Sequence, residues 1–473
     1  MAPTRNLHLA LLFAAMVVVQ TVAQICPYSD PKCKCGDQWV SCTGLQQIPP
    51  LNTGVNVSQI LHLYLEEGNL TSIGKNSLPP GLTEMWVYHQ PLINISDDAF
   101  DASVATLQHL SFGGPNFNSL PTVLQKLTTL KELMIDDTTI QVWDAAILKH
   151  ISSTLESLAL TNVSLSAWPS WISDFHLLRT IDLSQNSIKT IPDDAFRFIK
   201  DSLENLRLVG IGLTQIPQAF STLPNLLSLE LSQNNITDLS EIQRITKFPF
   251  AKWLSHLILN SVGLTSIENF SRFESLSTIS LNFNRISDVP VGSLPKFLRS
   301  LYITDNSLSS VPKDVAGMPN LFWLYLSGNL ITTIEPNAFP SSLTLVDLVR
   351  NNLTIITNTT FTNLVQLDSL RLDSNPISAI SPAAFSSMVA LRELHIRNSH
   401  MTEIPLALTL FSPQVNIYWT TTQTLSCPCP APQELVQWFS SLTGTTSIQA
   451  SCSNGQPIHS YLSGQCGQPK ATL

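Results

Sequence analysis

Eight cysteines are the residues whose type and spacing carry the clearest chemistry in this chain of 473 residues. They form two clusters, which read C-x6-C-x-C-x6-C and C-x-C-x22-C-x13-C: Cys26, Cys33, Cys35, Cys42 and Cys427, Cys429, Cys452, Cys466. Thiols grouped in this way form either disulfides or a metal site. Zinc knuckles use C-x2-C pairs, which neither cluster contains, so we expect disulfides. Four cysteines permit three pairings, and spacing alone does not choose among them.

The first 23 residues have the layout of a cleavable secretory signal. One arginine precedes an apolar run from Leu7 to Val19, and the small-residue segment Thr21-Val22-Ala23 follows it. A membrane anchor is the alternative, but the run is short for a bilayer. No later stretch of 18 or more residues is apolar, and the C-terminus lacks the hydrophobic tail of a lipid-anchor signal. We therefore expect a secreted, extracellular protein without a membrane span.

Between the cysteine clusters, apolar residues recur at one spacing. Residues 178–191 follow the pattern L-x-x-L-x-L-x-x-N-x-L, which can be placed fifteen times at intervals of 22 to 28 residues. Its central apolar residue falls at Leu65, Val87, Phe112, Ile135, Leu160, Leu183, Leu208, Leu231, Leu259, Leu281, Ile303, Leu326, Leu348, Leu372 and Ile396. The L-x-L alternation predicts a short strand with one buried face. No single turn can bury that face alone, so the turns must stack.

Two further columns of residues support this frame. The Asn position of the pattern is filled by Asn186, Asn234, Asn284, Asn306, Asn329, Asn351 and Asn375. Phenylalanines recur 12 or 13 residues after the central strand residue and are expected to pack as a spine: Phe100, Phe196, Phe220, Phe339, Phe361 and Phe385. The other turns carry Gly68, Gln90, Pro115, Thr138, Val163, Ile211, Val262 or Ser399 at the Asn position, so we expect these turns, the first five and three later ones, to be less regular.

This repeat, bracketed by cysteine clusters, resembles secreted, disulfide-capped leucine-rich repeat proteins over about residues 24–466. The resemblance implies an α/β fold, a curved horseshoe solenoid of about 15 repeats with a parallel β-sheet on its concave face. It also implies that each Asn hydrogen-bonds the backbone of its own and the neighbouring turn, and that each cap pairs its first cysteine with its third and its second with its fourth. The expected domains are a signal peptide (1–23), an N-terminal cap (24–58), the repeats (59–411) and a C-terminal cap (412–473).

A short amphipathic segment and one long interval complete the expected architecture. Residues 432–442 place Leu435, Trp438, Phe439 and Leu442 on one helical face, which predicts a helix that seals the last repeat. The interval between Leu231 and Leu259 is the longest, and its residues 241–253 are interpreted as a bulge on the convex side.

Aromatic side chains gather at both ends of the predicted concave face, in the strand positions between the inward apolar residues. One expected patch consists of Tyr64, Trp86, Tyr88 and His89. The other consists of Tyr302, Trp323, Tyr325, Arg371, His395, Arg397 and Tyr418. Tyr, Trp and Arg are the residue types enriched in protein-binding hot spots, so we expect both patches to bind a partner. The alternative is that aromatic residues simply favour strands.

Eight N-glycosylation sequons agree with secretion. Seven are predicted to be glycosylated: Asn56, Asn69, Asn94, Asn235, Asn269, Asn352 and Asn358. Asn162 is set aside because it follows a predicted strand, where a glycan would crowd the concave face.

Catalysis and nucleic-acid binding find no support in the sequence. No catalytic motif, cofactor fingerprint or metal motif occurs, so we expect no enzyme activity, cofactor or metal. Only 12% of residues are charged, the net charge is −9, and no basic run could neutralise phosphates. The expected function is binding of an extracellular protein in adhesion, matrix organisation or immune recognition. The alternative is a non-catalytic, stabilising subunit of a secreted enzyme complex, such as a luciferin monooxygenase or a carboxypeptidase, and glycan capture is a third possibility.

Overall fold

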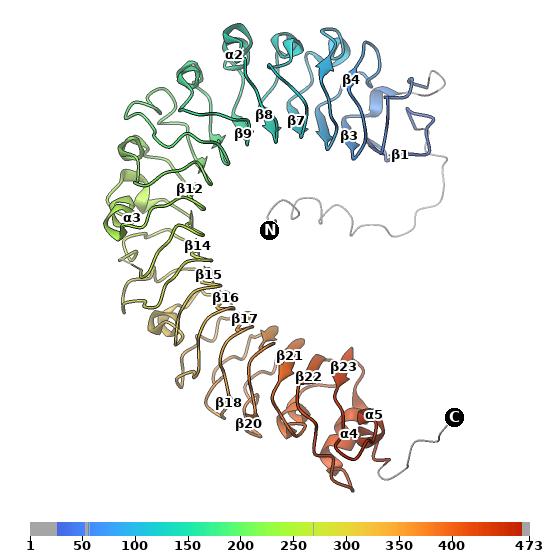
Figure 1. Ribbon diagram of the computed structural model, residues 1–473, viewed down its shortest axis with the longest axis vertical. Coiled ribbons are helices and arrows are strands. Elements are labelled where there is room, and N and C mark those ends of the chain that lie inside the picture. The colour runs from blue at the N-terminus through green and yellow to red at the C-terminus, as the bar shows by residue number, and fades with distance from the viewer. Residues whose placement is uncertain (1–25, 53–54, 56, 268, 466–473) are drawn as a thin grey trace. The chain divides into compact units, whose positions relative to one another are not determined.

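The computed structural model describes residues 26–52, 55, 57–267 and 269–465. They form two compact units, Met1–Leu155 and Glu156–Leu473. In each unit the chain makes successive turns, with short strands along one side of the stack and helices or bends along the other (Figure 1). The predicted signal peptide lies outside the described residues. Among those that are described, no helix is both long and apolar enough to cross a lipid bilayer.

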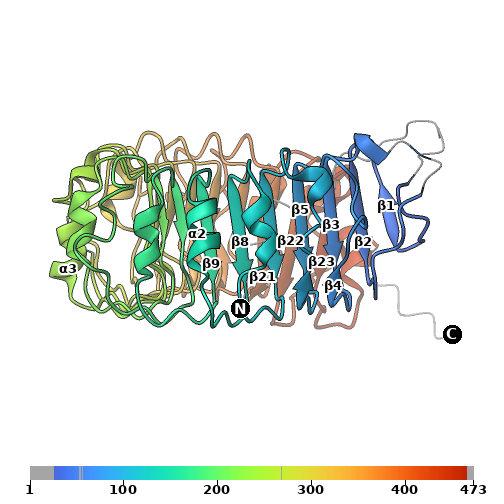
Figure 2. The same ribbon diagram turned by 90° about the horizontal axis from the view of Figure 1, so that it is seen from above.

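The first unit contains a small cap followed by four parallel repeat strands. Its sheet consists of β1 (Cys33–Cys35), β2 (Trp39–Thr43), β3 (His62–Glu66), β5 (Glu84–Tyr88), β7 (His109–Gly113) and β8 (Glu132–Asp136). β1 and β2 are antiparallel, and β2, β3, β5, β7 and β8 pair in parallel in that order (Figure 2). The remaining elements are η1 (Val57–Gln59), β4 (Ser72–Ile73), β6 (Asn94–Ile95), η2 (Asp101–Ser103), η3 (Thr122–Lys126) and α2 (Ala145–Ile151).

The second unit continues the same arrangement over thirteen parallel strands. These are β9 (Ser157–Thr161), β10 (Thr180–Asp182), β11 (Asn205–Arg207), β12 (Ser228–Glu230), β13 (His256–Ile258), β14 (Thr278–Ser280), β15 (Ser300–Tyr302), β16 (Trp323–Tyr325), β17 (Leu345–Asp347), β19 (Ser369–Arg371), β21 (Glu393–Ser399), β22 (Asn416–Thr421) and β23 (Thr446–Gln449). Opposite them lie η4 (Ser170–Asp174), η5 (Gln218–Thr222), α3 (Leu239–Ile245), η6 (Pro249–Lys252), η7 (Lys313–Gly317), η8 (Leu406–Leu410), and the paired β18 (Ile355–Ile356) and β20 (Ala379–Ile380). The unit ends with α4 (Gln433–Ser441) and α5 (Ile458–Leu462).

The predicted repeat frame is confirmed by burial and by strand register. All fifteen central apolar residues are at most 2% exposed. Within each unit, neighbouring strands pair equivalent frame positions: Leu65 faces Val87, for example, and Leu301 faces Leu324. Such a sheet buries one face because the side chains of a strand alternate between two sides, and stacking supplies the apolar surface that each turn lacks.

The Asn ladder is confirmed as a set of buried hydrogen bonds. Asn329, which is 3% exposed, donates from Nδ2 to the carbonyl of Leu326 in its own turn at 3.0 Å and to that of Ile303 in the preceding turn at 2.7 Å. Its Oδ1 accepts the N–H of Leu308 at 3.0 Å. The ladder therefore satisfies backbone groups that the bends would otherwise leave buried and unpaired.

The expectation that the early turns are less regular is wrong for their strands. β3, β5, β7, β8 and β9 are each five residues long, whereas most later strands have three. The expectation is confirmed for one later turn, since a register shift between repeat strands occurs between β21 and β22, near Ser399. Strand pairing depends on the backbone and on the inward apolar residues, which these turns keep. In one early turn Gln90 reproduces part of the Asn role: its Oε1 accepts the N–H of Leu70 at 3.0 Å, whereas its buried Nε2 has no hydrogen-bond partner among the described residues.

The phenylalanine column packs as predicted on the side opposite the strands. All six of its members are at most 3% exposed. The ring centroid of Phe361 lies 6.1 Å from that of Phe339 and 6.3 Å from that of Phe385. The ring centroids of Phe385 and Phe411 lie 5.1 Å apart. In an earlier part of the same unit Phe196 lies 6.1 Å from Phe220.

The long interval before Leu259 contains a helix and a 3-10 helix, which the sequence did not predict; the bulge on the convex side stays a prediction. Helix α3 begins after Asp238, whose carboxylate accepts the N–H of Ser240, and η6 follows it. Ile242 and Ile245 turn inward and are buried. The extra residues therefore form a regular helix that covers the core.

The cysteines pair as the resemblance implied wherever both partners are described. Cys26 is bonded to Cys35, Cys33 to Cys42, and Cys427 to Cys452. Cys466 lies outside the described residues, so its pairing with Cys429 stays a prediction. In the C-terminal cap α4 buries Leu435 and Trp438, as expected for a helix that covers the end of a stack.

We expect non-reducing peptide mapping of the secreted protein to recover these three disulfides together with Cys429–Cys466. Each should stabilise its cap by about 2 to 4 kcal/mol, because a cross-link restricts the unfolded chain. A bridge between the two clusters, or a reactive thiol at Cys429, would contradict the prediction.

Candidate binding surface on the strands

The solvent-facing side of the parallel sheet, here called the strand face, brings most of the second predicted patch together. Strand register places six residues side by side on six successive strands, β15 to β22: Tyr302, Tyr325, Asp347, Arg371, His395 and Tyr418. We call this line the C-terminal row. It exists because each residue occupies the same position in its repeat, between two inward apolar residues, so neighbours lie about 4.8 Å apart.

Two stacked ring pairs form the ends of the C-terminal row. The rings of Tyr302 and Tyr325 lie 4.7 Å apart with 10° between their planes. At the other end His395 and Tyr418 lie 4.5 Å apart at 24°, and the guanidinium of Arg397 lies 4.9 Å from the Tyr418 ring centroid. Stacked rings and a cation over a ring hold these side chains in defined positions.

Trp323 lies beside the row rather than within it. It points to the same face as Tyr325, two residues away on β16, but its register neighbours are Ser300 and Leu345. Its side chain is 48% exposed. Trp323 therefore offers apolar surface to solvent, whereas the residues of the row are half-buried.

The residues of the row are half-buried although they lie on the solvent-facing side of the sheet. Side chains on adjacent strands cover one another, and burial raises the pKa of both Tyr302 and Tyr325 above the usual value. His395 is buried further, with 17% side-chain exposure. Side chains that are already partly desolvated and held in fixed positions are well suited to binding. When a partner binds them, the cost of desolvation and of side-chain ordering is smaller than for fully exposed, mobile side chains.

Three carboxylates in or beside the row were not predicted from the sequence as site residues. Asp347 sits between Tyr325 and Arg371, and burial is the main cause that raises its pKa. Asp373 and Glu393 lie 3.9 Å and 3.6 Å from the ring nitrogens of His395. The signal was present, since aligning the repeats puts Asp347 in the same column as the aromatic residues.

The first predicted patch is partly assembled in the other unit. Tyr64 and Trp86 are register partners, and the rings of Trp86 and Tyr88 lie 5.9 Å apart. The Tyr88 hydroxyl lies 2.9 Å from the Ser111 hydroxyl. His89 follows the strand with a φ of 50°, in the turn, so it is not part of the strand row.

Two charged arrangements on the strand faces were not predicted. In the first unit His62 lies 3.1 Å from Glu84 and His109 lies 2.9 Å from Glu132, on successive strands. In the second unit Arg207 binds Asp182 at 3.0 Å and Glu230 at 2.8 Å, one carboxylate on each neighbouring strand. Burial raises the pKa of Glu230, and the charge of Arg207 opposes this shift.

The predicted glycosylation sites that the structure describes are all exposed: Asn69, Asn94, Asn235, Asn269, Asn352 and Asn358. Asn56 lies outside the described residues. Asn162 is exposed too. It directly follows β9, as expected when it was set aside because a glycan there would crowd the strand face.

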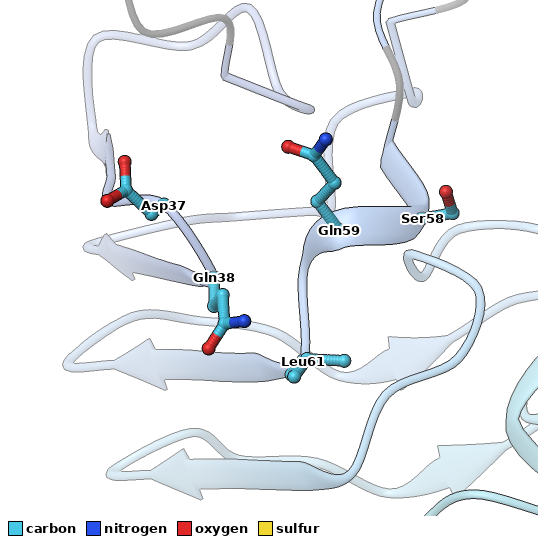
Figure 3. A pocket seen from close by; sticks show the side chains of 5 residues that line it. All are labelled: Asp37, Gln38, Ser58, Gln59 and Leu61. Carbon is cyan, nitrogen blue, oxygen red and sulfur yellow. The ribbon is translucent and has the colours of Figure 1, made fainter.

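Among the described residues, His, Cys, Asp and Glu side chains do not gather as metal ligands do, and no group of three or more of them could hold a metal ion. A shallow hollow in the first unit is lined by Asp37, Gln38, Ser58, Gln59 and Leu61 (Figure 3). It brings together one carboxylate with amide and hydroxyl groups from the β1–β2 turn and η1, and its residues were not singled out in the sequence.

Comparisons with known proteins agree with this geometry. Residues 296–340 and 341–401 match the family model described as leucine rich repeat. The leucine-rich repeat-containing G-protein coupled receptor 5 of Rattus norvegicus is 31% identical over 153 residues, which are 32% of this chain and 17% of the receptor. The chain therefore spans only about a sixth of that relative.

Two solved structures match most of the chain. A chain in the mouse RP105/MD-1 complex has a TM-score of 0.64 and 17% identity, with 84% of this chain and 73% of that chain covered. A chain in the Toll–Spatzle complex from Drosophila has a TM-score of 0.57 and 18% identity, with 90% and 60% covered. Together with the register and the Asn ladder, these matches show that this chain has the leucine-rich repeat solenoid fold.

Proposed function

We propose that this protein is a secreted, extracellular protein-binding module whose partner site is the C-terminal row together with Trp323 and Arg397. The observation that carries the proposal is the register of β15 to β22, which turns residues up to 116 positions apart in sequence into one continuous surface. This surface combines three tyrosines, a tryptophan and two arginines, the types that contribute most to binding energy at protein interfaces. Tyr64, Trp86 and Tyr88 are proposed as a second contact area, on the first unit.

The chemistry of the chain supports secretion. Disulfides persist in oxidising compartments, and three are formed among the described cysteines. The six described sequons that we predict to be modified are exposed, as glycosylation requires. The apolar segment near residue 10 has the composition of a secretory signal.

The compared structures support protein binding as the general activity. Both are complexes of two proteins, RP105 with MD-1 and Toll with Spatzle. We infer a protein partner for this chain by analogy of fold together with its own site. Adhesion, matrix organisation and immune recognition are the settings in which such a module would act.

Replacing Tyr325 and Arg371 together by Ala should weaken partner binding by about 2 kcal/mol or more, roughly a 30-fold rise in Kd, while secretion continues. The double variant removes one stacked ring and one cation from the centre of the surface. The partner is the protein that co-purifies with this chain from its native secretion, and affinity is measured by surface plasmon resonance.

The matched control replaces Lys313 and Glu335 by Ala. Both are exposed and lie away from the strand face. Equal losses in the two double variants, or no loss in either, would move the binding site to another surface. Co-purification with a catalytic chain at fixed stoichiometry would instead identify a stabilising subunit of an enzyme.

A further inference from the structure

Arg371 forms no hydrogen bond or ion pair with the described residues, although its charge acts on the nearby Asp347 and opposes the rise in the pKa of that carboxyl. Its Nε is buried and has no hydrogen-bond partner among the described residues, which also provide no ion pair for its guanidinium. A buried donor of this kind is unfavourable unless another group supplies an acceptor. Arg207 shows the contrast, because it occupies the same position in its repeat and is bound by a carboxylate on each neighbouring strand.

Two carboxylates near Arg371 each accept a backbone N–H, which does not by itself prevent an ion pair, since Asp182 accepts the N–H of Ser184 and also binds Arg207. Asp347 accepts the N–H of Val349 at 3.0 Å, and Asp373 accepts that of Arg397 at 2.6 Å. Arg397 itself lies over the Tyr418 ring, and its guanidinium forms no ion pair among the described residues. This part of the strand face therefore has two arginines whose charge no carboxylate of the described chain neutralises through an ion pair.

Aromatic pairs flank Arg371 on both sides along the row. Tyr302 and Tyr325 precede it, and His395 and Tyr418 follow it. The row crosses six strands, a span of about 24 Å at the usual strand spacing. About seven residues of an extended chain cover that distance.

We propose that Arg371 receives the side-chain carboxylate of an Asp or Glu within an extended segment of the partner, with the flanking aromatic pairs contacting the residues on either side of that acid. This inference rests on the proposed function. An internal acid is favoured over a chain-terminal carboxylate because binding surface continues in both directions from Arg371. Arginine suits the role, since its planar guanidinium presents two parallel N–H donors to a carboxylate.

The test uses three pools of nine-residue peptides, randomised except at the central position and acetylated at the N-terminus. The first pool has a central Glu and an amidated C-terminus, the second a central Gln and an amidated C-terminus, and the third a central Gln and a free C-terminal carboxylate. Each pool is passed over the immobilised full-length secreted protein, and the retained peptide is quantified by mass spectrometry. We expect retention of the first pool to exceed that of the second at least tenfold.

Variants then assign the preference to Arg371. In Arg371→Gln the ratio between the first two pools should fall towards one, and in Arg371→Lys it should take an intermediate value. Arg207→Gln is the matched control and should leave the ratio unchanged, with folding of each variant checked by thermal melting. The ratio of retention between the first two pools is also measured on the unmodified protein, so the inference can be tested even if one of the variants folds poorly.

Three outcomes overturn the inference. Retention of the third pool in place of the first would assign Arg371 to a chain terminus. Equal retention of all pools, abolished by replacing Tyr302 and Tyr325 with Ala, would exclude the carboxylate contact and leave the proposed site intact. Retention unaffected by any substitution on the strand face, or no retention at all, would remove the support for both the inference and the proposed site.

Discussion

Replacing Asn329 with Ala is expected to lower the free energy of unfolding by about 3 kcal/mol, because each buried polar group left unpaired costs about 1 to 3 kcal/mol. The substitution removes an acceptor from the Leu308 N–H and donors from the carbonyls of Ile303 and Leu326. The side chain is 3% exposed, so water reaches these groups only if the turn opens. Urea denaturation followed by circular dichroism measures the change.

The control for this prediction is Thr332→Ala, three residues further on. Thr332 is exposed, and we expect its replacement to change the stability by no more than about 0.5 kcal/mol, as at most surface sites. Equal effects of the two substitutions would mean that the ladder does not stabilise the stack.

Replacing Phe361 with Ala is expected to cost about 3 to 5 kcal/mol, the usual range for a buried phenylalanine, because it removes a ring and leaves a cavity. Phe361 is 1% exposed and stacks between Phe339 and Phe385. Its loss therefore also deprives two neighbouring turns of their contact. The urea midpoint, or the melting temperature, reports the destabilisation.

Phe297→Ala serves as the matched control in the same unit. The Phe297 side chain is 54% exposed, so little apolar surface returns to water when it is removed. We expect its effect to stay well below that of Phe361→Ala. A comparable loss at both positions would indicate that the phenylalanine column does not act as a spine.

The repeat frame could be predicted from sequence because its signals are periodic. An apolar residue that returns in the same context fifteen times can only be inward, and Asn at one fixed offset from it predicts the ladder. Departures from the period were harder to interpret. Gln90 supplies the acceptor of the missing Asn through a longer side chain, and α3 and η6 fill the longest interval, because local hydrogen bonding and helix capping decide these cases.

The sequence also predicted which residues lie together in the C-terminal row, but it did not predict which of their charges are paired. The repeat position alone is enough to place Tyr325, Arg371 and Tyr418 in one row, and the strand register agrees. Whether an arginine in that row is paired depends on side-chain conformations and on the residues of adjacent strands. Arg207 and Arg371 occupy the same position with opposite results, which the period alone cannot distinguish.

The Asn ladder gives the stack a direction. Asn186, Asn329 and Asn375 each bond to their own turn and to the turn before it. Detaching a turn from the C-terminal end therefore strips hydrogen bonds from the backbone of the turn that remains. Detaching one from the N-terminal end instead leaves the Asn of the remaining turn without its partners in the preceding turn, and either detachment also breaks backbone hydrogen bonds between the turns. The side-chain hydrogen bonds that are lost on detachment therefore differ between the two ends of the stack, so we expect its resistance to unfolding to differ between them as well.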